Sequence, residues 1–192
     1  MPSISHQHWA TTRRAALDEL EHAHRLVGGK GPGRRYATHQ LNQAYAVMLS
    51  GQFQGFCREL YTECVAHFLV NVPIVSLQKS FHTLLTQNLK LNTGNPNPGN
   101  IGNDYNKFSI YFWDEVQKLH RRNESYLVAI EEMNGWRNAI AHQDFDPAKL
   151  KSRTVLRLRQ VQYWRNACTK LALAFDDVMR SHLHQVNGIY PW

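Results

Sequence analysis

Arg137, Asn138 and His142 are the residues whose types best suit chemistry on a phosphodiester. An arginine stays protonated and offers a planar fork of N–H donors, which matches phosphate oxygens and the extra charge of a phosphorane. A histidine exchanges a proton near neutral pH, and such acid–base catalysis contributes about 10² to 10⁴ in rate. We therefore assign phosphate clamping to Arg137 and proton transfer to His142. Asn138 has a supporting role, in which it orients His142 or bonds the substrate backbone.

RNA is the phosphodiester that this pair of side chains suits, because its 2′-hydroxyl is a built-in nucleophile. Attack by that hydroxyl needs proton transfer and charge stabilisation, but no metal ion, no cofactor and no covalent enzyme intermediate. The expected products carry a 2′,3′-cyclic phosphate and a 5′-hydroxyl. A formal net charge of +7 at pH 7 also favours a polyanionic partner, with nucleic acid as the first candidate.

The spacing of these residues limits how one helix can present them. At about 100° per residue, Arg137 and His142 lie roughly 140° apart around the axis, whereas Asn138 and His142 share a face. Either the helix loosens before Gln143, or arginine and histidine act on one phosphate from opposite subunits of a two-fold dimer. We favour the homodimer.

The helix that carries the three residues is predicted over residues 124–142. It should end near His142, because a proline follows shortly after and restricts the residue before it. A structural role is the alternative for both charged residues. Arg137 would then sit at the shoulder of an apolar stripe and pair with Glu59 or Asp144, and His142 would interact with the helix dipole.

The chain as a whole is expected to be all-α. Apolar side chains recur at helical spacing, and no stretch alternates between apolar and polar residues beside hairpin turns. With 192 residues, the sequence predicts a single-domain helical bundle of about five to six helices over residues 1–192. The second helix could break near Ser50 and Gly51. The expected helices cover residues 8–27, 36–71, 75–91, 105–120, 124–142 and 149–186.

Two connections stand out by their composition. Residues 1–35 contain an N-terminal helix that stops at Gly28 and Gly29, followed by a basic, Gly- and Pro-rich connection. Residues 92–106 are crowded with Asn, Pro and Gly, which indicates a loop. This loop is longer than most, so it either carries function or is an exposed insertion, and we favour the insertion.

The last predicted helix is basic, with no acidic residue in residues 147–175. Arg153 and Arg157 are four residues apart and would share a helix face. Together with Arg159 they are candidates for binding RNA phosphates. A solvated charged face is the alternative.

Other reactive residue types are interpreted as structural. Tyr163 and Trp164 are expected to be core residues rather than platforms for base stacking. Cys57 and Cys64 are expected to be small buried hydrophobes, which suits a reducing cytoplasm. No metal site is predicted, because histidine pairs spaced by two point to nearly opposite sides of a helix. These pairs are His6/His8, His22/His24 and His182/His184.

Residues 136–142 read Trp-Arg-Asn-Ala-Ile-Ala-His, which resembles the RxxxxH motif of the HEPN superfamily. Asn follows Arg directly, small and apolar residues fill the middle, and the motif falls in the penultimate helix of an all-α chain. Residues 53–68 are similar to the amphipathic early helix of the same family. The likeness in architecture covers about residues 36–183, and it leaves the first helix and residues 92–106 as departures.

The resemblance implies an RNA-cleaving homodimer, in which the Arg and His of both subunits meet in one cleft. Such proteins are often toxins or phage-defence effectors, so an antitoxin or other regulatory protein is an expected partner. One alternative is a non-catalytic helical module that binds a nucleotide, RNA or a partner protein. Another is a DNA-binding regulator that uses the basic last helix, although no compact helix-turn-helix signature is present.

The sequence gives no sign of membrane association. No apolar run approaches the eighteen or so residues that span a bilayer. Residues 1–9 lack the basic start and apolar stretch of a signal peptide. We expect a cytoplasmic protein.

Overall fold

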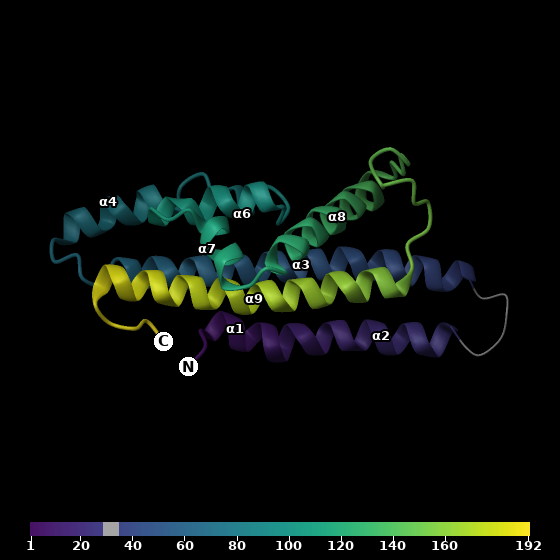
Figure 1. Cartoon of the computed structure of the whole chain (residues 1–192), viewed down its shortest axis with the longest axis horizontal. Helices are drawn as coiled ribbons and strands as arrows, with labels where there is room; N and C mark the ends of the chain where they lie inside the picture. The colour runs from purple at the N-terminus through teal and green to yellow at the C-terminus, as the bar shows by residue number, and fades with distance from the viewer. Residues whose placement is uncertain (29–34) are drawn as a thin grey trace.

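The computed structural model describes residues 1–28 and 35–192, and every regular element in these ranges is a helix (Figure 1). The predicted all-α fold is therefore confirmed. Most of the predicted basic connection lies outside the described residues. Within these two ranges, none of the helices combines the length and the apolar character that crossing a membrane requires.

Long helices form the body of the molecule. α3 (Arg35–Phe68) and α9 (Leu158–Asn187) pack along each other, and α2 (Arg14–Gly28) lies against α3 on one side of this pair (Figure 1). α8 (Asn123–His142) crosses obliquely and contacts both α3 and α9. The first helical stretch begins earlier than predicted, because α1 (Ile4–His8) and a π-helical turn (Trp9–Arg13) lead directly into α2.

Of the two possibilities for the second helix, the single long helix is correct and the break is not, because α3 runs unbroken through Ser50 and Gly51. Ser50 is buried, and its hydroxyl donates to Asn134 Oδ1 of α8 at 3.2 Å. The helix thus passes through the core at this point, where packing against α8 outweighs the weak helix propensity of Ser and Gly.

The core is aromatic where the long helices meet the segment before α8. Phe175 of α9 is fully buried at its centre. The rings around Phe175 belong to Phe53, Phe56, Tyr105, Phe112 and Trp113, with centroid separations of 4.8 to 6.4 Å. These partners come from α3, α6 and α7, so one ring joins the bundle to the shorter helices.

The prediction for residues 75–120 needs correction, because this stretch contains more and shorter helices than expected. They are α4 (Val75–Thr86), α5 (Lys90–Thr93), α6 (Pro98–Tyr105), a 3₁₀ turn (Asn106–Phe108) and α7 (Phe112–Leu119). Asn88 and Ser109 have positive φ values of 54° and 60°, and they separate these helices.

Residues 94–97 of the Asn- and Pro-rich segment are non-helical, and the segment becomes helical again at Pro98 because its residues form a cap. Asn97 Oδ1 accepts the N–H of Asn100 at 2.8 Å, and Pro98 occupies the first helical position of α6. An Asn cap followed by Pro is a favoured start of a helix. The same residues that indicated a loop therefore begin α6.

The last helix begins at Leu158 and not near residue 149. Ser152 has a φ of 59°, and its N–H donates to Pro147 O at 2.8 Å, which closes a turn. Arg153 holds the segment against α8 through Glu132, with Nη1 2.7 Å from Oε1. Arg153 and Arg157 therefore precede the helix and do not share a helical face, which corrects the prediction.

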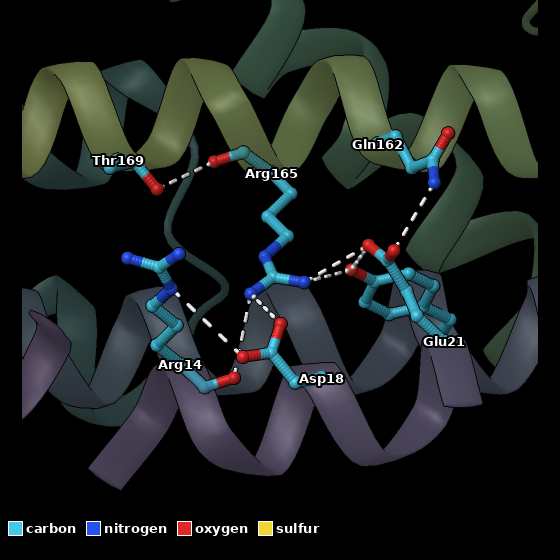
Figure 2. Close-up of polar contacts among 7 residues, drawn as sticks. Arg14, Asp18, Glu21, Gln162, Arg165 and Thr169 are labelled. Carbon is cyan, nitrogen blue, oxygen red and sulfur yellow. Dashed lines mark hydrogen bonds and ion pairs between the residues drawn. The ribbon is translucent and has the colours of Figure 1, made fainter. Parts of the chain in front are cut away.

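Arg165 joins the N-terminal helix to the body (Figure 2). Its guanidinium lies 2.5 Å from Asp18 Oδ1 and 3.0 Å from Glu21 Oε1, both on α2. It also donates to the Tyr45 hydroxyl of α3, which in turn donates to Glu21 at 2.6 Å. Gln162 adds a bond to the other oxygen of Glu21. One polar cluster thus links α2, α3 and α9.

This cluster lowers the pKa of the Glu21 carboxyl from its ordinary value of 4.5. Partial burial alone would raise that pKa, but the hydrogen bonds from Tyr45 and the two α9 side chains outweigh burial. A carboxylate with a depressed folded-state pKa stabilises the fold above its unfolded-state pKa. That contribution is lost as the pH falls through the folded-state value.

Glu21→Gln is therefore expected to lower the melting temperature at pH 7 and to have a smaller effect in acid. Thermal unfolding followed by circular dichroism at pH 7, 4.5 and 3 measures the difference in melting temperature between wild type and variant. This difference should keep its pH 7 size above about pH 4.5 and become smaller below it. Glu19→Gln, at an exposed position of the same helix, is the control. A difference of constant size across this range would contradict the role given to the ionised carboxylate.

Candidate active site

α8 ends where the sequence predicts, directly after His142. Gln143 adopts the left-handed conformation with φ 54°. Its N–H donates to Ile140 O at 3.4 Å, and the N–H of Asp144 donates to Ala139 O at 3.0 Å. This pair of bonds is a Schellman cap, which satisfies the last carbonyls of the helix. The stop is thus made by the cap itself, before the chain reaches the following proline.

The candidate residues lie at the surface of this helix end. Arg137 is half-buried, and Asn138 and His142 are exposed. The opposite side of α8 enters the core through Met133 and Trp136. A substrate can therefore reach the arginine and the imidazole without any rearrangement of the bundle.

Asn138 is held between two donors. Its Oδ1 accepts from Arg137 Nη1 at 3.1 Å and from Asn95 Nδ2 at 3.0 Å. One turn earlier, Asn134 Nδ2 donates to Pro96 O at 3.0 Å, so the chain around Asn95 is tied to α8 at two points. The segment expected to be an exposed insertion contacts the candidate site, and it reaches Arg137 through Asn138.

Neither acidic partner suggested for Arg137 pairs with it. Glu59 binds Arg13, with an N–O distance of 2.6 Å, and Asp144 binds Lys149 at 2.8 Å. Within residues 1–28 and 35–192, no carboxylate forms an ion pair with Arg137. Its charge is available for an anion from outside the chain.

Asp144 is the acidic group close to His142. The hydrogen bond and charge of Lys149 lower the pKa of the Asp144 carboxyl, and His142 adds a smaller contribution of the same sign. The imidazole therefore has a carboxylate neighbour just beyond the helix end. His142 also lies in the last turn of α8, where a protonated side chain interacts favourably with the helix dipole.

α8 keeps its α-helical form through His142, so the predicted alternative of a loosened helix end is wrong. Arg137 and His142 of one chain thus leave the helix in different directions, roughly 140° apart. A single α8 does not direct both groups to one phosphate from the same side.

The three arginines predicted to bind RNA line one pocket, of about 580 Å³. Arg153 reaches it from the loop, Arg157 from the cap position of α9, and Arg159 from the first turn. Trp136, the residue before Arg137, forms part of the wall. Trp136 is the one residue of α8 in the lining of this pocket.

The two aromatic residues of α9 differ in their surroundings. Trp164 is buried, as predicted, and its Nε1 lies 3.4 Å from Glu132 Oε2. Tyr163 is 43% exposed and lines the same pocket, so the prediction of a core position is wrong. Consecutive helical residues point about 100° apart, and only one of this pair can face α8.

The remaining reactive groups are elsewhere. Cys57, Cys64 and Cys168 are free and buried, and burial raises the pKa of each thiol. The prediction that Cys57 and Cys64 are buried hydrophobes is confirmed. In the part of the chain that the structure describes, no group of three or more His, Cys, Asp or Glu side chains is placed to hold a metal ion.

Comparison with known families agrees with the motif. The family model RiboL-PSP-HEPN matches residues 12–181. The chain belongs to this HEPN family. The matched region contains residues 136–142, and it also spans most of the N-terminal helix and residues 92–106. Comparisons with curated proteins and with solved structures gave no match.

Proposed function

We propose that this HEPN protein is a metal-independent endoribonuclease, with His142 as the acid–base residue and Arg137 as the clamp on the scissile phosphate. The observation that supports the proposal best is that the two charged residues of the motif are free to meet a substrate. Arg137 is held by Asn138 and by no carboxylate of the described residues, and His142 is exposed at the end of the same helix.

The reaction moves one proton at each of two oxygens. An imidazole takes the proton of the 2′-hydroxyl, whose oxygen then bonds to phosphorus. The bond from phosphorus to the 5′ oxygen breaks, and an imidazolium protonates that oxygen. The guanidinium of Arg137 stabilises the added negative charge of the phosphorane, which needs no metal ion. The products are a 2′,3′-cyclic phosphate and a 5′-hydroxyl.

A two-fold homodimer would bring these groups together. Because Arg137 and His142 diverge around α8, the arginine of one subunit would face the histidine of the other across the axis. The cleft would then hold two such pairs. We further propose that the enzyme acts in the cytoplasm as a toxin or phage-defence effector, under the control of an antitoxin or other regulatory protein.

The test is incubation of a 5′-labelled single-stranded RNA with the protein in EDTA. The expected fragments resist phosphatase until acid opens the cyclic phosphate, and their downstream partners accept a label from polynucleotide kinase without prior dephosphorylation. Metal-dependent cleavage that leaves 5′-phosphates would overturn the mechanism. Intact RNA under all conditions would overturn the nuclease. Growth arrest on expression is expected for the toxin role, and a harmless wild type would contradict it.

A second candidate is an RNA- or nucleotide-binding module without catalysis. The observation that favours it is the pocket of about 580 Å³ with three arginines in its lining, which serves binding whether or not cleavage follows. RNA that is bound but not cut by the wild-type protein would select this function.

Asn95 offers a test of how the clamp is positioned. Asn95→Ala removes one of the two donors that fix Asn138, so we expect kcat to fall about 10- to 100-fold with little change in KM. The melting temperature should stay near that of the wild type. Asn103→Ala, at an exposed position of α6, is the control. Equal activity of both variants and the wild type would show that Asn95 does not position the clamp.

A further inference from the structure

The pocket that the three arginines line has the size and lining of a binding site. Its volume of about 580 Å³ falls within the usual range of roughly 300 to 1,000 Å³ for small-molecule sites. It is bounded by the loop before α9, the first turns of α9 and one residue of α8. The lining consists of Trp136, Arg153, Thr154, Val155, Leu156, Arg157, Arg159, Gln160 and Tyr163.

One of the three arginines builds the pocket and the other two remain available. Arg153 bonds Glu132 of α8 at 2.7 Å and Gln160 of α9 at 3.0 Å, which fixes the loop to both helices. Arg157 and Arg159 are exposed, and neither forms an ion pair with any acid in residues 1–28 and 35–192. Two guanidinium groups therefore border this pocket with no counter-charge from the chain.

The backbone adds to this positive character. α9 spans 30 residues, and no side chain caps its N-terminus at Arg157. The first N–H groups of a helix have no intrahelical partner, and with the helix dipole they attract anions. The start of α9 thus adds backbone donors to the charge of the two arginines.

The pocket also offers apolar surface to a ring. Tyr163 is 43% exposed and Val155 is 59% exposed, and both line the pocket. A tyrosine face suits the stacking of an unpaired base, whereas a base paired within a duplex is not free to leave its stack. N–H groups that can bind a phosphate, placed beside an aromatic face, suit a nucleotide better than they suit a simple anion.

We propose that this pocket holds one unpaired nucleotide of the RNA substrate, with its base on Tyr163 and its phosphate against Arg157 and Arg159. The inference rests on the proposed function and names its substrate class: RNA with a single-stranded or looped segment. Trp136 in the pocket wall directly precedes the clamp residue Arg137 in the sequence, so the pocket is bordered by the helix that carries the motif.

Binding can be measured apart from cleavage in a His142→Ala background, by fluorescence anisotropy of a labelled single-stranded RNA. Arg157→Ala and Arg159→Ala are each expected to weaken binding and to reduce the slope of log K against log salt by about one. Tyr163→Ala should weaken binding about 5- to 150-fold, and Tyr163→Phe should not, because it keeps the ring. Arg121→Ala and Tyr111→Ala remove the same groups at exposed positions outside the pocket.

The outcomes separate the pocket from the nuclease. The pocket is supported if the pocket variants bind RNA more weakly, while the control variants bind like the His142→Ala protein and all melting temperatures stay unchanged. Parent-like binding by all variants overturns it and leaves the nuclease intact if the wild type still cuts RNA. If pocket and control variants lose RNA affinity equally, binding depends on the overall positive charge of the surface, and this outcome also overturns the pocket proposal. A wild type that neither binds nor cuts RNA ends both proposals.

Discussion

His142→Ala is expected to slow RNA cleavage by about 10² to 10⁴-fold while leaving the fold intact, because in the proposed mechanism the imidazole carries the proton transfers, and the side chain is exposed. Arg137→Ala should cost a similar factor through loss of charge stabilisation at the phosphorane. Arg137→Lys keeps the charge but not the bidentate fork, so we expect it to restore little of the rate. Single-turnover cleavage of labelled RNA in EDTA measures all three.

The control for this series is His82→Ala, which removes an exposed histidine of α4 outside the motif. Circular dichroism and size-exclusion chromatography establish that each variant keeps the helical content and assembly state of the wild type. If His142→Ala cuts RNA as fast as His82→Ala, the acid–base assignment fails, and the family membership stands without it.

Mixing two inactive variants is expected to restore cleavage. In a dimer where the arginine of one subunit works with the histidine of the other, a heterodimer of Arg137→Ala and His142→Ala keeps one complete pair. Random exchange makes half of the dimers mixed, and each mixed dimer has one intact pair of two, so activity should recover to about a quarter of wild type. Starting from variants slowed about 10² to 10⁴-fold, this is a large gain.

The mixture needs a measure of subunit exchange, for example capture of an untagged variant by a tagged one. Each variant mixed with itself provides the background rate. If exchange is complete and cleavage stays at that background, then arginine and histidine of the same chain act together, and the proposed arrangement across the axis is wrong.

The sequence predicted the all-α fold and the helix of the motif well, because both follow from local pattern. Residues 124–142 were expected to be helical, and α8 covers Asn123–His142. Where long-range contacts decide, prediction failed. Residues 149–157 have helical periodicity, yet the ion pair between Arg153 and Glu132 holds this stretch as a loop against α8. A pair 21 residues apart in the sequence leaves no periodic signal.

The candidate site was found only in part for the same reason. Arg137, Asn138 and His142 stand in one helix and form a readable motif. Asn95 lies 43 residues before its partner Asn138, in a stretch whose composition suggested a loop. The cap formed by Asn97 and Pro98 was a signal that could have revealed α6. Nothing in the sequence could show that the chain before α6 contacts the motif.

The abrupt end of α8 has a consequence for access to the imidazole. In a continuous helix, residue 146 would stand one turn above His142 on the same side and shield the ring from large molecules. The left-handed turn at Gln143 redirects the backbone before that can happen. The terminal histidine therefore has no residue of a following helical turn above it, and its ring stays exposed at the end of the helix.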